Sequence, residues 1–599
     1  MVSKIFFHNR CVVFFIKNKM IGLVTMIAFR LLAVIVMTFW ITACSEKGVE
    51  SKEKGFEELI VNSIDDTFDK AIEKEKGDDA SINEEAKSIQ LEKSLSTDQI
   101  IRKTEKGTDK KLNESDWWSP GEERDFPSVV SYPNATGIAT TFFEFDHESE
   151  PFQTKDHPFF SAIGNNGRAC VTCHQPADGM SLTAETAKKR WKETDGTDPL
   201  FSAIDGSDCP HLPQERESSH SLLINHGLFR IFRPWPPLPV NGVEVEPQFD
   251  IEVVRDPTGC NTHSIYGLNS LEPMVSVYRR PRPATNLKYI TSVGFPFEPK
   301  NGLPLPIDPL TGEMVSGNIT ADSRVWTLRE QAIDALKSHM EYSGEIDESV
   351  IEQIIVFETK IFTAQSVDFR GGDLTDAGAK GGPEFLAKAA EGVLNSGTRL
   401  PMWDEYESWL MYLGKNYDDL SNDFPALTKE QFEFRQSVAR GVKFFRDVTF
   451  LVKDNAGITD MGFGNPVRND CNFCHNMTRS GMDVAPGQVD LGTTNLPFSD
   501  PAPHLPLFKL TCKEGYAPHA HLGKTVLTSD PGFALTTGRC KDIGKITIQS
   551  MRGLAARAPY FSNGSAESIR GIVDYYARRY NITMTEQQKI DLTNLMSVL

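Results

Sequence analysis

Basic side chains are fewer than acidic ones in this sequence. Its 599 residues include 63 Lys and Arg against 82 Asp and Glu, which gives a formal net charge of −19. General nucleic-acid binding needs Lys and Arg to displace counterions from phosphates, so this charge argues against a nucleic-acid partner. A negative surface would instead suit a small basic redox protein as partner.

Aromatic residues are scarce between residues 45 and 115. The stretch is rich in Lys, Glu, Asp and Ser, and Phe56 and Phe68 are its only aromatic residues. A segment of this composition buries too little apolar surface to offset the entropy lost on ordering. We expect residues 45–115 to be a charged, disordered tether.

A dense apolar run at 31–41 follows Arg30 and ends in Ile41-Thr42-Ala43-Cys44. This ending resembles a lipobox, in which the cysteine is lipidated and becomes the new N-terminus. We interpret residues 1–44 as a lipoprotein-type signal. Because Ser45 and not Asp follows Cys44, a lipid anchor in the outer membrane, facing the periplasm, is favoured. A transmembrane anchor is the alternative, but the run is short for a span of ~20 residues.

The ten cysteines suit an oxidising compartment. Two close pairs occur, Cys170/Cys173 and Cys471/Cys474. Apart from Cys11 and Cys44 in the signal, four cysteines remain. We expect these to form disulfides within one domain each, although sequence alone leaves the connectivity open. The expected bonds are Cys209–Cys260 and Cys512–Cys540.

Each close pair belongs to a C-x-x-C-H pentapeptide. The two copies are Cys170-Val171-Thr172-Cys173-His174 and Cys471-Asn472-Phe473-Cys474-His475. Thiols at this spacing can add to the two vinyl groups of one haem, and the adjacent histidine can then ligate the iron. We therefore predict two covalently bound haem c groups with His174 and His475 as iron ligands.

Zinc binding and thiol redox chemistry are the alternatives for these pairs. One zinc site built from both pairs would need ligands some 300 residues apart and would leave both histidines unexplained. A redox C-x-x-C normally opens a helix after a strand, whereas loop-like sequences precede both motifs here.

We expect a mainly α-helical fold with long irregular loops, in which two c-type cytochrome domains pack around two haems. Residues 116–425 would form an N-terminal haem domain with insertions, and 426–599 a C-terminal cytochrome c-like domain. Helices are predicted at 321–340, 347–362, 428–445, 567–580 and 585–599. Thr428/Gln431 and Thr585/Gln588 are capping-box pairs. The helices around the second motif resemble the terminal helix pair of class I cytochrome c.

Four segments match motifs of one known family. They are Asn166-Gly167-Arg168-Ala169 before the first motif, Arg280-Pro281-Arg282-Pro283-Ala284-Thr285-Asn286, Asp322-Ser323-Arg324 with Leu328-Arg329-Glu330-Gln331-Ala332, and Pro559-Tyr560-Phe561-Ser562-Asn563-Gly564. With these segments the chain from about residue 155 resembles the di-haem cytochrome c peroxidase/MauG superfamily. The resemblance implies peroxide reduction at the N-terminal haem and electron transfer through the C-terminal haem.

Glu330 and Arg324 are the catalytic candidates that the resemblance offers. Glu330 would transfer a proton between the two peroxide oxygens, and Arg324 would stabilise developing negative charge. A surface carboxylate and a salt-bridged arginine are the respective alternatives. The family's distal glutamine aligns with Ile319, which weakens the case for ordinary peroxide turnover.

The distal ligands are the main departures from the family. No histidine lies between His174 and His211, so the first haem is expected to be five-coordinate unless His211, His220 or His226 reaches it. At the second haem the usual methionine position falls on Tyr576, as in MauG. A core tyrosine is the alternative, with Tyr575, Met551 and Met584 as other ligand candidates. The resemblance also implies a calcium ion, with Asn286 as a candidate ligand.

Three functions follow as hypotheses. The first is an exported di-haem peroxidase-type oxidoreductase that uses hydrogen peroxide. The second is an oxygenase that binds dioxygen, because the loop-rich insertions and missing histidine resemble the di-haem rubber-cleaving enzymes. The third is a membrane-tethered electron-transfer cytochrome without catalysis.

Overall fold

The structure is a computed structural model, and it describes residues 117–144, 152–239, 244–291, 318–390, 405–421, 424, 426–460, 462–475 and 488–599. The expected signal at 1–44, with its lipid site Cys44, and the whole of the expected tether at 45–115 lie outside the described residues. Across the described ranges, no helix is both long and apolar enough to cross a membrane.

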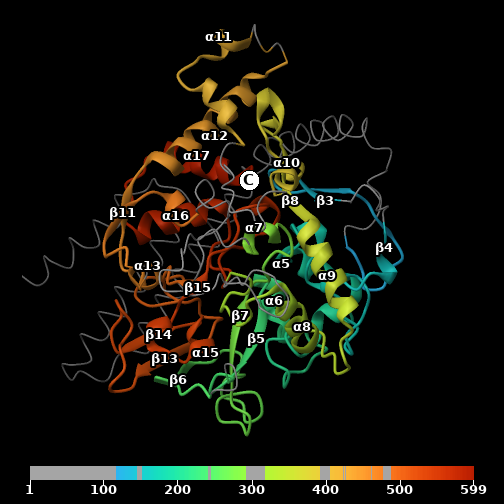
Figure 1. Cartoon of the computed structure of the whole chain (residues 1–599), viewed down its shortest axis with the longest axis vertical. Helices are drawn as coiled ribbons and strands as arrows, with labels where there is room; N and C mark the ends of the chain where they lie inside the picture. Colours follow the sequence, from blue (N-terminus) through green and yellow to red (C-terminus); the bar gives the residue numbers. More distant parts are fainter. Residues whose placement is uncertain are drawn as a thin grey trace, which may run out of the picture. The chain divides into compact units, whose positions relative to one another are not determined.

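The expected mainly α-helical fold is wrong, because small antiparallel sheets lie between the helices (Figure 1). The largest has the strand order β2-β3-β8-β9. Its strands are β2 (Val129–Pro133), β3 (Gly137–Phe143), β8 (Ile361–Asp368) and β9 (Gly372–Asp373). Strands β3 and β8 are rich in β-branched and aromatic residues, which favour a pleated, half-buried surface. Their pairing is long-range: Thr141 and Thr363, 222 positions apart, share a hydrogen bond of 2.9 Å.

A second sheet, in the order β14-β13-β6, contains strands from both sides of the boundary expected at residue 425. These are β6 (Phe249–Arg255), β13 (Leu507–Cys512) and β14 (Thr525–Thr528). Residues 112–599 accordingly form one compact unit by their contacts. The two-stranded sheets pair β1 (Asp125–Phe126) with β4 (Phe152–Gln153), β5 (Phe229–Pro234) with β7 (Met274–Arg279), β10 (Phe450–Val452) with β11 (Val467–Asn469), and β12 (Gln488–Val489) with β15 (Ile546–Thr547).

All five predicted helices are present. They are α8 (Leu328–Ser338), α9 (Glu348–Lys360), α12 (Lys429–Asp447), α16 (Ile569–Arg579) and α17 (Glu586–Ser597). Helix α8 begins seven residues later than predicted, because Thr327 caps it through a capping box with Glu330. Both predicted capping boxes, at α12 and α17, are confirmed. The shorter helices are α5 (Ala184–Thr194), α6 (Ser221–His226), α7 (Leu287–Thr291), α10 (Pro383–Ala390), α11 (Tyr417–Ser421), α13 (Ala456–Asp460) and α15 (Ala534–Thr537).

Helices α12 and α17, orange and red in Figure 1, pack against each other before and after the second motif. Gly441 allows the close approach, since a Cβ atom there would lie 2.4 Å from the Asp591 carbonyl oxygen. The Asp591 carboxylate accepts hydrogen bonds from Ser437 and Arg440 across the same contact. The helix pair expected around the second motif is therefore present, although it belongs to a mixed α and β fold.

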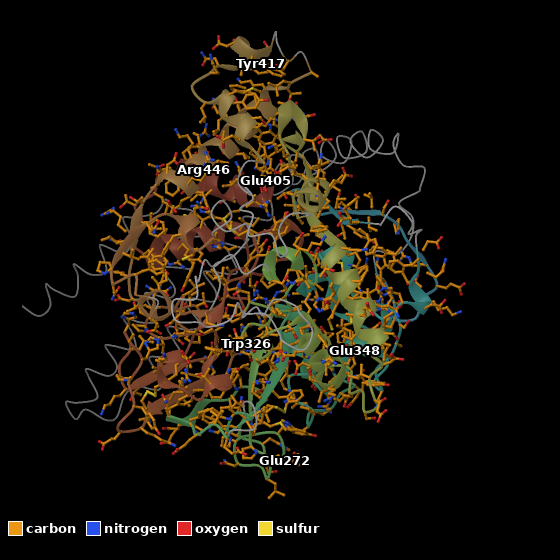
Figure 2. The ribbon with its side chains drawn as sticks, in the orientation of Figure 1. Glu272, Trp326, Glu348, Glu405, Tyr417 and Arg446 are labelled. Carbon is orange, nitrogen blue, oxygen red and sulfur yellow. A yellow bond between two sulfur atoms is a disulfide. The ribbon has the colours of Figure 1, made fainter. Side chains whose placement is uncertain are left out.

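Helices α8 and α9 pack together beside the first motif. Arg329 on α8 donates two hydrogen bonds of 2.7 Å to Glu348. Glu348, labelled in Figure 2, lies in the first turn of α9. The buried face of α9 carries Ile354, Phe357 and Glu358 into the core. Phe357 lies in a cluster of stacked, tilted and edge-on rings with Phe126, Phe143, Phe152, Phe159 and Phe160. This cluster fixes the position of α9 relative to the first motif.

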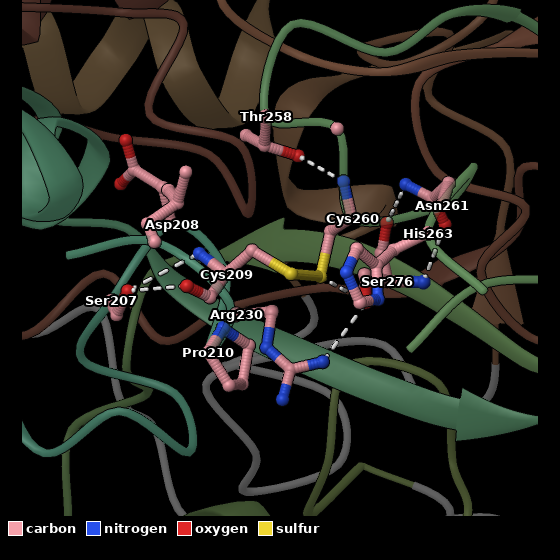
Figure 3. The surroundings of a disulfide bond; sticks show 12 residues. Ser207, Asp208, Cys209, Pro210, Arg230, Thr258, Cys260, Asn261, His263 and Ser276 are labelled. Carbon is pink, nitrogen blue, oxygen red and sulfur yellow. Dashed lines mark hydrogen bonds between the residues drawn. A yellow bond between two sulfur atoms is a disulfide. The ribbon is translucent and has the colours of Figure 1, made fainter. Parts of the chain in front are cut away.

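Both expected disulfides, Cys209–Cys260 and Cys512–Cys540, are confirmed. Around the first of them, Ser207 accepts a hydrogen bond from the Cys209 backbone, and Arg230 donates to Ser276 (Figure 3). The four cysteines of the two C-x-x-C-H motifs form no disulfide.

Candidate functional site

The first motif forms one tight turn, the 3₁₀ helix Cys170–Thr172. The backbone N–H groups of Cys173 and His174 both donate to the Cys170 carbonyl, at 3.2 and 3.1 Å. Both thiols and the His174 ring line one hollow, which we call the first cavity. Burial raises the pKa of both thiols, that of Cys173 to about 12, so both stay protonated at neutral pH.

The His174 ring has a defined tautomer. Its Nδ1 lies 3.1 Å from the Met180 carbonyl oxygen, which can only accept, so Nδ1 carries the proton. Burial lowers the pKa of His174 to about 4, while the Met180 contact acts the opposite way. A neutral imidazole with a free Nε2 is the form that ligates iron, and a carbonyl at Nδ1 is its usual orienting group.

One face of helix α8 forms a wall of the first cavity. Leu328, Gln331, Ala332 and Ala335 lie on it at the i, i+3, i+4 and i+7 spacing of a single helical stripe. Glu330 lies off this stripe. Other walls come from α9, from β5, from the segment 279–284 and from the segment that contains Thr320, Ala321 and Arg324.

Glu330 is exposed and does not line the first cavity. Its carboxylate accepts hydrogen bonds from the backbone N–H groups of Trp326 at 2.8 Å and Thr327 at 3.3 Å. The residue thus completes the N-terminal cap of α8, and its role as the distal acid stays a prediction. Its neighbour Gln331 lines the cavity.

Arg324 lines the first cavity as expected, and it is also salt-bridged. Its guanidinium donates to Asp334 at 3.0 Å and to Asp322 at 3.1 Å. Asp322 is fully buried and also pairs with Arg279 at 2.7 Å, and Arg279 makes two hydrogen bonds with Asp530. Because both carboxylates hold it, Arg324 is a rigid part of the cavity wall.

Glu358 on α9 is the acidic residue that sequence reasoning missed. Only 5% of it is exposed, it lines the first cavity, and its Oε2 has no hydrogen-bond partner among the described residues. Burial raises the pKa of Glu358 to about 8. The sequence feature that could have identified Glu358 is its position on the apolar stripe of the predicted helix, next to Phe357 and four residues after Ile354.

His339, directly after α8, is the second residue that was missed. It lines the first cavity, and its Nδ1 lies 2.6 Å from Oδ2 of Asp205. Burial alone would raise the pKa of Asp205, but the charge of Arg168 and the His339 contact outweigh this and hold the pKa below its usual range. A carboxylate can only accept, so the proton of this hydrogen bond lies on Nδ1 of His339.

None of the three histidines considered from the sequence lines the first cavity. His211 stacks on His263, and His226 stacks on His504. Both ring nitrogens of His220 contact backbone carbonyls, at 2.8 and 2.9 Å. His339 was overlooked because it is 165 positions beyond the motif, although the fold brings it to the same hollow.

Two arginines of the first cavity form no salt bridge with a described residue, although the charge of Asp178 acts on one of them, Arg280. Arg280 and Arg282 donate to backbone carbonyls and, for Arg282, to the Thr547 hydroxyl, and neither pairs with a carboxylate among the described residues. Burial lowers the pKa of each to about 10. A ligand with two carboxylates would offset this buried positive charge. Two thiols, a neutral imidazole and two guanidinium groups together fit a haem c with its two propionates.

The second motif repeats the tight turn in the 3₁₀ helix Cys471–Phe473. The N–H groups of Cys474 and His475 donate to the Cys471 carbonyl, at 3.3 and 3.2 Å. Both thiols and His475 line a second, mostly apolar hollow, which we call the second cavity. Its donor set therefore also fits a haem c.

Tyr576, Met551 and Met584 all line the second cavity. No described residue makes a hydrogen bond with the Tyr576 hydroxyl, and burial raises its pKa well above the usual value. A metal ion that replaced its proton would remove this cost. Tyr575 points elsewhere, since its hydroxyl donates to the Leu491 carbonyl at 2.8 Å and it lines a different hollow.

Within the described ranges, no three His, Cys, Asp or Glu side chains are grouped so that they could hold a metal ion alone. Asn286, the calcium candidate, uses both polar atoms of its side chain on the Thr363 backbone, at 2.9 and 3.1 Å. Both observations leave the thiols and histidines of the motifs as the candidate cofactor residues.

A hollow of about 1630 Å³ forms an open groove that contains neither motif. It borders the second cavity at Thr493 and Phe561, which line both. Although larger than either cavity, it contains neither of the thiol and imidazole sets, so we place the chemistry in the two motif cavities.

No protein-family model matches this chain, and no curated protein matches it significantly. The function is therefore inferred from the two cavities and from the motif resemblance.

Proposed function

We propose that this protein is an exported di-haem oxidoreductase of the cytochrome c peroxidase/MauG type. Hydrogen peroxide would react in the first cavity, and electrons would pass through the second. The observation that carries the proposal is that each C-x-x-C-H motif presents two unpaired thiols and a histidine to a cavity of its own.

The difference between the cavities supports distinct roles for them. The first contains the acid–base and amide groups Glu358, His339 and Gln331, whereas the second contains the ligand-type side chains Tyr576, Met551 and Met584 along with Asp470 and Gln549. Proton transfer is required where an O–O bond breaks, and a stable axial ligand is required where only electrons pass.

The first haem, when bound, would supply the iron redox chemistry that cleaves peroxide. Reduction of one hydrogen peroxide to two waters consumes two electrons and two protons. Glu358, protonated at neutral pH by its burial, can donate a proton to the leaving oxygen. Gln331 can orient the bound peroxide through its amide, and His339 can accept a proton at Nε2. Glu358 thus replaces Glu330 in the proposed mechanism.

We also propose a periplasmic location with a lipid anchor in the outer membrane, and a small redox protein as electron donor. The ending Ile41-Thr42-Ala43-Cys44 and the net charge of −19 support these two parts of the proposal.

Stopped-flow absorption of the resting protein mixed with peroxide tests the reaction. We expect rapid spectral change and formation of water at the expense of an added electron donor. A stable dioxygen adduct without peroxide consumption would favour the oxygenase, and no response to either oxidant would favour a simple electron-transfer cytochrome. Both outcomes contradict the proposal.

A further inference from the structure

The two cavities share a wall, in which a residue that lines the first contacts residues that line the second. Arg282 lines the first cavity, and its guanidinium donates to the hydroxyl of Thr547 and, at 3.1 Å, to the carbonyl of Ile548. Thr547 and Ile548 line the second cavity. Arg282 therefore touches the first cavity directly and the second through two hydrogen bonds.

Thr547 also makes hydrogen bonds with a second segment of the first cavity. Its hydroxyl donates to the Thr320 carbonyl at 3.0 Å, and its backbone N–H donates to the Ala321 carbonyl at 3.0 Å. Thr320 and Ala321 both line the first cavity. Thr547 of strand β15 is thus hydrogen-bonded to two segments that line the first cavity, one at Arg282 and one at Thr320 and Ala321.

Arg282 differs from three other cations of the first cavity. Arg168, Arg279 and Arg324 each pair with a carboxylate. The described residues offer Arg282 only uncharged acceptors, and the charge that acts on it is that of another cation, Arg557. A guanidinium has five N–H donors, so Arg282 can bind a carboxylate while it keeps its bonds to strand β15.

We propose, on the basis of the proposed function, that Arg282 couples the two haems. Its guanidinium would hold a propionate of the first haem, and its bonds to Thr547 and Ile548 extend this contact to the wall of the second cavity. The two haems would supply the redox chemistry, a one-electron transfer that oxidises the second and reduces the first, with no bond or proton exchanged. Arg282 is thus a positioning residue for electron transfer.

The test uses the full mature protein with both haems and three variants, Arg282→Gln, Arg282→Lys and Thr547→Val. Flash photoreduction supplies less than one electron per molecule, and absorption follows how the electron redistributes between the haems. Thr528→Val is the matched control, because Thr528 is a buried threonine that donates to the Asp530 carbonyl and lines neither cavity.

We expect Arg282→Gln and Thr547→Val each to slow this redistribution about tenfold, which corresponds to about 1.4 kcal/mol of activation free energy. The double variant should be no slower than Arg282→Gln alone, because both changes break one contact. Arg282→Gln should also lower the midpoint potential of the first haem, since it removes a positive charge, whereas Arg282→Lys and Thr547→Val should leave that potential nearly unchanged.

Unchanged redistribution in both Arg282→Gln and Thr547→Val, with two haems bound, would overturn the coupling and leave the proposed function intact. If Arg282→Gln failed to fold, Thr547→Val would decide the question alone. Slowing by Thr528→Val to the same extent would also overturn the proposal. Absence of haem from the wild-type protein would instead overturn the proposed function.

Discussion

Glu358 and Glu330 lie on the packed helices α9 and α8, yet only Glu358 presents its carboxyl group to the first cavity. Glu330 caps its own helix from the exposed side. The two residues therefore form a natural pair of variants for the peroxide reaction.

Glu358→Gln should slow the reaction with peroxide by about 10²- to 10⁴-fold, the usual contribution of a positioned acid or base. Glu330→Gln keeps a cap acceptor and should change the rate little, with at most about 1 kcal/mol lost in the free energy of unfolding. Stopped-flow rates for both variants, with haem content measured in parallel, provide the check. If Glu330→Gln reacted slowly with peroxide and Glu358→Gln reacted at the normal rate, Glu330 would be the catalytic acid.

Tyr576→Phe tests the axial ligand of the second haem. Since a phenolate favours ferric iron, its loss should raise the midpoint potential of that haem and alter its ferric EPR signal. Met551→Leu and Met584→Leu serve as controls of similar volume in the same cavity. An unaltered Tyr576→Phe spectrum, together with an altered spectrum of either methionine variant, would assign the ligand to methionine.

Gly441→Ala should destabilise the contact between α12 and α17. The added Cβ would lie 2.4 Å from a backbone oxygen, and such overpacking costs about 1–3 kcal/mol. Gly571→Ala in α16 is the matched control, because its Cβ would meet the Ser568 hydroxyl at an ordinary 3.5 Å. That change should be neutral or stabilise by up to about 1 kcal/mol. Denaturant unfolding of both variants measures the difference; equal effects would contradict the packing of this helix pair.

Asp322 should make the fold sensitive to acid. Burial would raise its pKa, but Arg279, Arg324 and Arg233 outweigh this and hold the pKa far below its usual value. Because the pKa of Asp322 is lower in the folded protein than in the unfolded chain, its ionised form contributes fully to stability at pH values above the unfolded pKa of about 3.8. This contribution is lost progressively as the pH falls below that value. Asp322→Asn should therefore be less stable at pH 7 and should show a shallower loss of stability between about pH 4 and pH 2. An unchanged slope in acid unfolding would refute this role.

Local patterns predicted the elements that depend on local chemistry. The capping pairs at Thr428 and Thr585 located two helices, and the cysteine positions gave both disulfides. The mixed fold was missed because its sheets join distant segments, as β3 with β8 and β6 with β13. Such pairing depends on partners that a local pattern does not contain.

The candidate site divides in the same way. The motif residues were found by their spacing, whereas His339 and Asp205 meet only through the fold, 134 positions apart. Glu330 was chosen because it matches a motif, and the motif does not say which face of the helix lines the cavity. Successive residues on a helix point about 100° apart, so Glu330 lies off the stripe that contains its neighbour Gln331.

Peptide mass spectrometry of the mature protein, isolated from cells with active haem-maturation machinery, tests the central claim most directly. We expect one haem bound through two thioether bonds on the peptide containing Cys170 and Cys173, and one on the peptide containing Cys471 and Cys474. Unmodified thiols on both peptides, with no Soret absorption from the intact protein, would contradict the account.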